Sequence, residues 1–82
     1  MQKETLTHLG LYLAKKSVNK ADVARKTGLS TYRISQLSIN TKSHLRVDEL
    51  FLIALAIEAD PAELLAFVCE DVSLPLKEKV NQ

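Results

Sequence analysis

Residues 20–39 read KADVARKTGLSTYRISQLSI and have the pattern of two short helices joined by a sharp glycine turn. Asn19 is a favourable N-cap for the first helix, and Ser30 is the equivalent cap for the second. Gly28 suits the left-handed backbone that closes a helix, because it has no Cβ to clash. Ala24 supplies a small side chain where the two helices must approach. This segment is therefore predicted to be a helix-turn-helix.

The second of these helices has two faces of different chemistry. At about 100° per residue, Ile34 and Leu37 point to the interior. The opposite face carries hydroxyl, phenol, carboxamide and aliphatic groups, from Thr31, Tyr32, Ser35, Gln36 and Ile39. Such groups match base edges in the major groove, where Gln pairs with adenine and Ser or Thr with several bases. An ordinary solvated face looks similar, but the register of Ala24 and Gly28 favours DNA recognition.

The net charge of +1 conceals two halves of opposite sign. Residues 1–46 contain nine Lys and Arg and two acidic residues, a formal charge of +7. Residues 47–82 contain two Lys and eight acidic residues, a formal charge of −6. The basic half includes the predicted helix-turn-helix, so its surroundings suit phosphate groups.

Length and composition allow one modest domain. The chain has 82 residues, of which 46% are hydrophobic and 5% aromatic, so its core is expected to be mainly aliphatic. Cys69 is the only cysteine, which excludes an intrachain disulfide, and we expect it to be a small core residue. The chain shows neither a signal-peptide pattern nor a long apolar segment, so we expect a cytoplasmic, nucleoid-associated protein.

Three further helices complete a predicted all-α fold, a compact five-helix bundle. Hydrophobic periodicity and N-terminal signals place them at residues 5–16, 47–58 and 61–69. Gly10, inside the first, indicates close packing against another helix. The second is apolar over most of its surface, as expected for a buried central helix. The third is predicted to bury Leu64, Leu65 and Val68.

Residues 70–82 are predicted to form a C-terminal tail outside a domain of residues 1–69. Apolar residues alternate in its first part, which indicates an extended segment that lays three side chains on a surface: Val72, Leu74 and Leu76. Residues 77–82 are predicted to be frayed. Residues 38–46 are predicted to be a polar loop, with Asn40 in the left-handed conformation of a tight turn.

Five short helices with the helix-turn-helix in the second and third is the plan of the lambda repressor/Cro-type (XRE-like) DNA-binding family. Residues 5–69 resemble this family through the motifs VNKADVARKTGLSTYRIS and VDELFLIALAIEADPAELL. The resemblance implies a prokaryotic or phage transcriptional regulator, of the repressor type, that binds double-stranded DNA sequence-specifically. It also implies a homodimer on a palindromic operator, with residues 30–39 in the major groove.

The resemblance assigns roles by position. It implies that the bases are read by Thr31, Tyr32, Ser35 and Gln36. It implies that phosphates are bound by Lys20, Arg33, Asn40, Lys42 and Arg46. The chain departs from the family pattern at three positions. Lys20 replaces a glutamine, Asn40 stands where glycine is common, and Leu45-Arg46 replaces a Pro-Ser/Thr entry, which leaves the cap of the fourth helix unassigned.

Other classes of function have less support in the sequence. His8, His44 and Cys69 are scattered without metal-ligand spacing, and the chain lacks a Gly-rich phosphate loop, a nucleophile elbow and an HExxH motif. We therefore expect no enzyme, cofactor, metal or small-molecule ligand. The remaining alternative is a protein-binding helical module, of the antitoxin or anti-repressor type, that uses the acidic C-terminal half.

Overall fold

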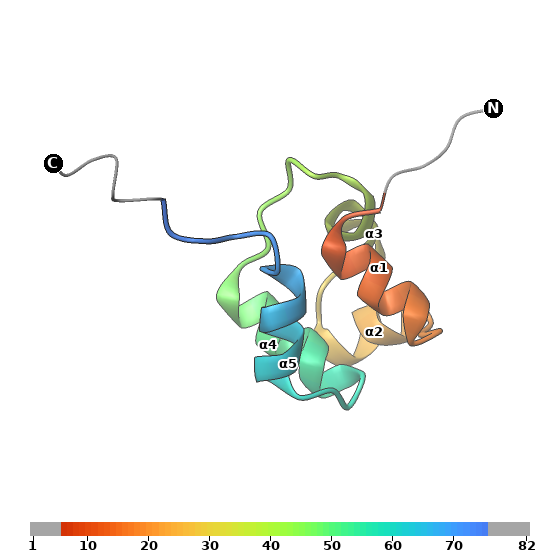
Figure 1. Ribbon diagram of the computed structural model, residues 1–82. Helices are drawn as coiled ribbons and strands as arrows, with labels where there is room; N and C mark the ends of the chain where they lie inside the picture. The colour runs from red at the N-terminus through yellow and green to blue at the C-terminus, as the bar shows by residue number, and fades with distance from the viewer. Residues whose placement is uncertain (1–5, 76–82) are drawn as a thin grey trace, which may run out of the picture.

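The computed structural model describes residues 6–75, which contain five α-helices and no β-strand (Figure 1). The helices are α1 (His8–Lys15), α2 (Lys20–Thr27), α3 (Thr31–Ile39), α4 (Val47–Ala56) and α5 (Pro61–Val68). The predicted all-α bundle and the position of the helix-turn-helix in α2 and α3 are confirmed.

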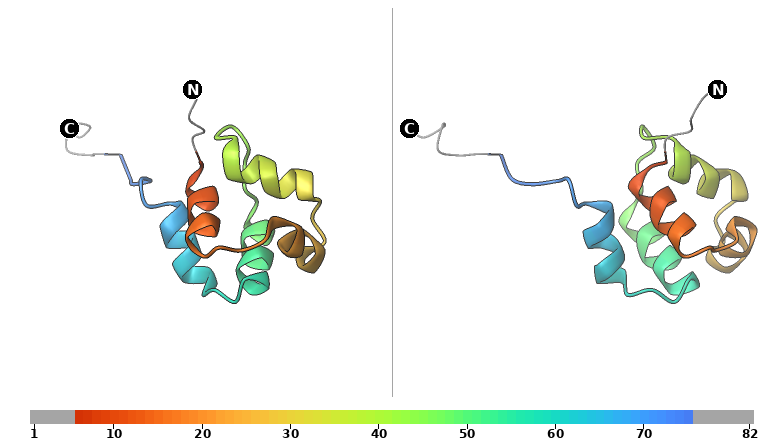
Figure 2. Two further views of the ribbon diagram at one scale, coloured as in Figure 1. Left: turned by 90° about the vertical axis from the view of Figure 1, so that its right-hand side faces the viewer. Right: turned by 45° about the vertical axis from the view of Figure 1, so that its right-hand side comes forward.

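The helices enclose one aliphatic core. α3 packs against α1 and α2, α4 packs against α2 and α5, and α1 packs against α5. Every helix contributes to the core, whose buried apolar residues are Leu9, Tyr12, Leu13, Val23, Ala24, Ile34, Leu37, Leu50, Ile53, Ala54 and Leu64. Figure 2 shows α2 and α3 on one side of the molecule and α5, with the segment that follows it, on the other.

The helix-turn-helix has the predicted caps. The side chain of Asn19 accepts a hydrogen bond from the backbone N–H of Asp22 at 3.1 Å, and Ser30 Oγ accepts one from Arg33 N–H at 3.0 Å. Gly28 closes α2 with φ of +85°, the left-handed conformation that a side chain would strain. Ala24 is buried, as its place between the two helices requires.

The start of α1 lies directly against the C-terminal end of α3. A Cβ atom on Gly10 would overlap the carbonyl oxygen of Ser38, so only glycine fits at this contact. Thr7, the N-cap of α1, donates its hydroxyl to Leu37 O at 2.6 Å and its N–H to Ser38 O at 2.9 Å. Its Oγ1 also accepts the Gly10 N–H at 3.0 Å. Close packing at Gly10 is confirmed, and Thr7 satisfies carbonyl groups that the end of α3 leaves open.

Arg33 connects α3 to α4. Its Nε and Nη2 donate to the two carboxylate oxygens of Glu49, both at 2.9 Å, and Nη2 also donates to His44 O at 2.9 Å. Glu49 is only 5% exposed and accepts the N–H of Arg46 at 2.9 Å as well. The Arg33 side chain holds the pKa of Glu49 below its ordinary value, although burial opposes this, and the Arg46 N–H acts in the same direction. The same contact raises the pKa of Arg33.

Several predicted helix ends differ from the structure. α1 begins at His8 rather than near residue 5, because Thr7 is its cap; residue 5 itself lies outside the described residues. α3 includes Ser38, which the sequence pattern places in the loop and which is fully buried. α4 ends at Ala56 rather than at residue 58, because the chain reverses through Glu58, whose φ is +59°.

Burial in the C-terminal half is lower than the sequence pattern predicts. α4 is not covered all round, since Phe51 and Leu55 are both about half exposed. On α5, Leu64 is fully buried as predicted, but Leu65 is 51% exposed. Cys69 is exposed too, so its prediction as a core residue is wrong. One side of the α4–α5 pair is therefore apolar and uncovered by the described residues.

The segment after α5 leads away from the helices (Figure 1). Val72 is 69% exposed and Leu74 is 86% exposed within the described chain, so their contact with a surface stays a prediction. Leu76 and residues 77–82 lie outside the described residues. The domain boundary at residue 70 stays a prediction.

Replacing Gly10 with alanine should separate α1 from α3. The added methyl group overlaps the Ser38 carbonyl, and overpacking of this kind costs about 1–3 kcal/mol. Thermal unfolding followed by circular dichroism measures the loss. The matched control is Gly28→Asn, where the space is open and asparagine tolerates a left-handed backbone, so its loss should be smaller. A Gly10→Ala variant that melts like the parent would contradict the close contact.

Acid should destabilise the fold through Glu49. Its pKa in the folded state is lower than in the unfolded chain, where the pKa of a Glu side chain is about 4.3. The stabilisation from its carboxylate is therefore complete above that pH and is lost as the pH falls through the folded-state pKa. Urea unfolding at pH 7, 4 and 3 should show a shallower pH dependence for Glu49→Gln than for the parent. The control is Asp48→Asn, an exposed neighbour in a surface ion pair. Equal pH dependence in Glu49→Gln and the parent would show that the carboxylate has no such role.

Candidate nucleic-acid interface

The outward face of α3 is free of packing contacts while its inward face is fixed. Ile34, Leu37 and Ser38 are buried against the core. On the other side, Thr31 is exposed and Tyr32 is 74% exposed, and Ser35 and Gln36 are partly exposed. The four predicted base-reading side chains therefore share one accessible face, at the side of the molecule away from α5 (Figure 2). Their contact with bases stays a prediction.

Gln36 belongs to a short hydrogen-bond chain at the end of α3. Its Oε1 accepts from Asn40 Nδ2 at 3.0 Å, and Asn40 Oδ1 accepts from the N–H of Lys42 at 2.9 Å. Asn40 has φ of −104°, an extended backbone, so the predicted left-handed conformation is wrong. The Asn40 side chain thereby orients the Gln36 amide, and its predicted phosphate contact stays a prediction. The NH₂ group of Gln36 and the second lone pair of its Oε1 have no partner among the described residues.

The predicted phosphate ligands differ in whether their side chains already bind other groups of the protein. Lys20, the first residue of α2, and Lys42, in the loop after α3, form no ion pair within residues 6–75. Arg46 pairs with exposed Asp48 at 3.4 Å, a weak surface interaction that a phosphate can replace. Arg33 is bound to Glu49 and to a backbone carbonyl. These bonds give Arg33 a structural role, and its predicted phosphate contact stays a prediction.

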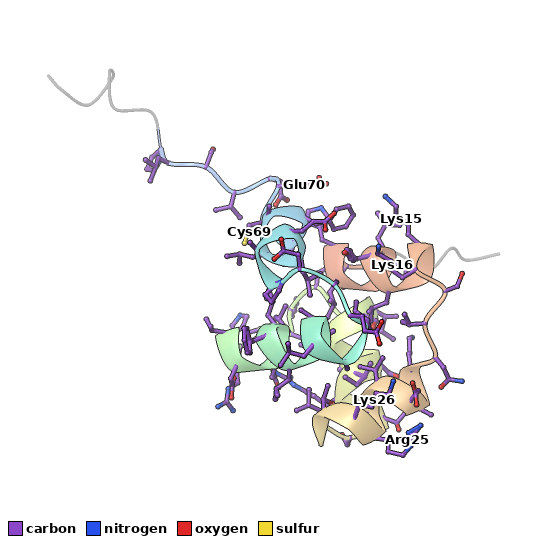
Figure 3. All side chains as sticks on the ribbon, turned by 90° about the horizontal axis from the view of Figure 1, so that it is seen from below. Lys15, Lys16, Arg25, Lys26, Cys69 and Glu70 are labelled. Carbon is purple, nitrogen blue, oxygen red and sulfur yellow. The ribbon has the colours of Figure 1, made fainter. Side chains whose placement is uncertain are left out.

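Four other cations of the basic half lie at α1 and α2, and each has an acidic or aromatic partner. Lys15 and Lys16 project from α1, and Arg25 and Lys26 project from α2 (Figure 3). Asp22 pairs with Arg25 and with Lys26, and the distance to Lys26 is 3.2 Å. Lys15 lies 5.2 Å from the ring centre of Phe67, and Lys16 lies 5.4 Å from that of Tyr12. Lys3 is outside the described residues. The positive half therefore does not form one uniform patch around α3.

The described residues offer little for other chemistry. They include no group of three or more His, Cys, Asp or Glu side chains that could hold a metal ion. His8 is used in packing, with Nδ1 at 3.0 Å from Val68 O and its ring edge-on to Phe67. His44 is an exposed loop residue, and its backbone carbonyl accepts a hydrogen bond from Arg33 Nη2. Within residues 6–75, no helix has the length and apolar character needed to cross a membrane.

Two residues that position α3 are not found by the sequence pattern. The pattern puts Thr7 inside a longer first helix rather than at its cap. It predicts a mostly apolar helix over residues 47–58 and gives Glu49 no part in the core, although Glu49 precedes buried Leu50 and shares a helix face with buried Ile53. An acidic residue on an inward helix face is a signal for a buried ion pair, because an unpaired buried charge is costly.

A protein-family comparison agrees with this geometry. The model of the Cro/C1-type HTH DNA-binding domain matches residues 8–70, which include all five helices. No curated protein and no solved structure matches the chain. The family match covers most of the sequence, including the helix-turn-helix of α2 and α3. The chain therefore belongs to the Cro/C1-type helix-turn-helix DNA-binding family.

Proposed function

We propose that this protein is a transcriptional regulator that reads double-stranded DNA sequence-specifically, with α3 in the major groove. The observation that carries the proposal is the polar outward face of α3, together with Lys20 at the start of α2 and Lys42 in the loop after α3, which have no ion-pair partner within residues 6–75. An α-helix fits the width of the major groove. Cations at the edges of such a helix meet the phosphates on either side.

Gln36 is the principal base reader in this proposal. Its free NH₂ group can donate to adenine N7 while Oε1 accepts from the adenine N6 amino group. Asn40 already holds Oε1 at 3.0 Å, which reduces the rotamer freedom that Gln36 loses on binding. Tyr32, with most of its surface exposed, can contact a thymine methyl or a base edge beside it. Thr31 and Ser35 add shorter hydroxyl contacts.

Lys20, Lys42 and Arg46 form the phosphate-binding set. They come from the start of α2, the loop after α3 and the N-cap of α4. Contacts of this kind fix the register of the protein on DNA without reading sequence. We further propose a homodimer on a palindromic operator in the cytoplasm, associated with the nucleoid. Its two recognition helices would then be about 34–36 Å apart, one turn of DNA.

The division between base reader and phosphate anchor can be tested by two substitutions. The cognate duplex is first selected from a randomised pool, and binding is followed by fluorescence anisotropy over a salt series. Gln36→Ala should cost about 1–3 kcal/mol on the cognate duplex and little on a scrambled one. Lys42→Ala should weaken both duplexes alike and reduce the slope of log affinity against log salt by about one for each phosphate that is no longer neutralised.

The control for charge is Lys26→Ala, which removes the same charge from a lysine already paired on α2. It should leave the cognate preference intact and change the salt slope less than Lys42→Ala does. If Gln36→Ala weakens both duplexes equally, Gln36 does not read bases. If the parent shows no salt dependence, the protein-binding alternative is favoured over DNA binding.

A further inference from the structure

An apolar groove lies between the first half of α4 and one side of α5, along the whole length of α5. It has a volume of about 440 Å³ and is lined mainly by aliphatic and aromatic side chains, including Val47, Phe51, Leu65, Val68 and Cys69. Phe51 and Leu65 are each 51% exposed within the described chain. An exposed apolar surface of this kind commonly marks an interaction site.

We propose that this groove binds the C-terminal segment of a second copy of the chain, residues 70–75, so that two copies exchange their segments reciprocally. The inference rests on the proposed function, because it supplies the dimer that a palindromic operator requires. The inference names the dimer surface, which is the groove, and its occupant, which is the segment of the other copy. It also explains why a single copy leaves both the groove and the segment exposed.

The segment has the chemistry of an occupant for this groove. Val72 and Leu74 are its apolar side chains, and both are largely exposed. Alternate residues of an extended segment point to the same side, so the two can enter one groove together. Pro75 restricts the backbone, which lowers the entropy lost when the segment binds.

Charge is complementary as well. Arg46 is the one charged side chain that lines the groove among the described residues. Glu70 and Asp71 are the charged side chains of the segment, and both remain more than half exposed. An acidic start of the segment can therefore meet the cationic edge of the groove, while the aliphatic side chains that follow fill its interior.

The segment is directed away from the groove of its own copy. α5 packs against both α1 and α4, and the groove is on the α4 side. Glu70 and Asp71 lie instead on the α1 side, at 3.6 Å and 3.8 Å from the ring nitrogens of His8. Val72 follows on that side, at the rim of a cleft that residues of α1 and the α3–α4 loop also line, and it stays 69% exposed. Figure 1 and Figure 3 show the segment leaving the end of α5 at Cys69 and Glu70.

The groove nevertheless begins where the segment emerges. Cys69 lines it, and the backbone N–H of Val72 bonds to Cys69 O at 2.9 Å. A two-fold axis near Cys69 would therefore bring each segment to the groove of the other copy within a few residues. A short exchange of this kind is isologous, so it closes as a dimer and does not propagate.

The test compares a segment variant, Leu74→Asp, with a groove variant, Leu65→Asp. The control is Leu11→Asp, a similarly exposed leucine on α1 outside the groove. Analytical ultracentrifugation over a concentration series should show a dimer for the parent and for the control. Dimer dissociation constants of the two variants should rise by at least about tenfold. Circular dichroism melting checks that each variant is folded, and Val47→Asp replaces Leu65→Asp if the latter unfolds.

An equimolar mixture of the two variants separates the possible occupants. The intact segment of the groove variant can enter the intact groove of the segment variant, so the mixture should regain part of the association. No recovery in the mixture would mean that each segment occupies its own groove. A Leu74→Asp variant that stays dimeric would mean that two grooves pack without the segment. A parent that is monomeric throughout would also overturn the proposal.

The result of the dimerisation test does not depend on whether a single domain binds DNA. At low salt, the folded monomeric variants should still bind random duplex through Lys20 and Lys42, because neither lysine lines the groove. Loss of exchange with retained DNA binding would reject this inference alone. Absence of DNA binding in the parent would reject the proposed function instead.

Discussion

The position of α3 depends first on its backbone contact with α1. Gly10 has no Cβ, so α1 reaches the Ser38 carbonyl directly, and Thr7 binds the carbonyl groups of Leu37 and Ser38. These bonds satisfy the C-terminal end of α3, and Thr7 also caps α1 by accepting the Gly10 N–H. The first half of α3 is held separately, by the paired guanidinium and carboxylate of Arg33 and Glu49. Because both halves of α3 are held by contacts on its inward side, the outward face of α3 is not needed for packing and is available for recognition.

The same arrangement explains why cations in the basic half have different roles. Arg33 lies on α3 itself, yet its Nε and Nη2 donate to a nearly buried carboxylate and a backbone carbonyl. Lys20 and Lys42 lie beside α3 without acidic partners among the described residues. The net charge of each half of the sequence therefore indicates only coarsely which side of the molecule suits phosphate groups. The pairing of individual side chains decides which cations can meet phosphate, because an internal ion pair must break before its cation can bind elsewhere.

The features that could be predicted from the sequence are those with local causes. Asn19, Gly28 and Ser30 act on the backbone within a few residues, so the helix-turn-helix was predictable from residues 19–39. The sequence predicted that another helix approaches Gly10 closely. It could not identify Ser38 as the partner, because Ser38 is far away in the sequence. The Arg33–Glu49 pair and the open α4–α5 groove depend on tertiary packing. Apolar residues such as Leu65 were expected inside, although hydrophobic side chains at a surface are common and carry no positional signal of their own.

We propose that the fixed inward face of α3 leaves its outward face to bind DNA, while the α4–α5 groove serves another purpose. Titrating ¹⁵N-labelled protein with a selected duplex and following the amide signals tests this residue by residue. We expect the largest shifts at Lys20, at residues 31–36 and at Lys42, with small shifts at Phe51 and Leu65. Shifts concentrated on α4 and α5, with α3 unchanged, would contradict this and would place the binding surface in the acidic half.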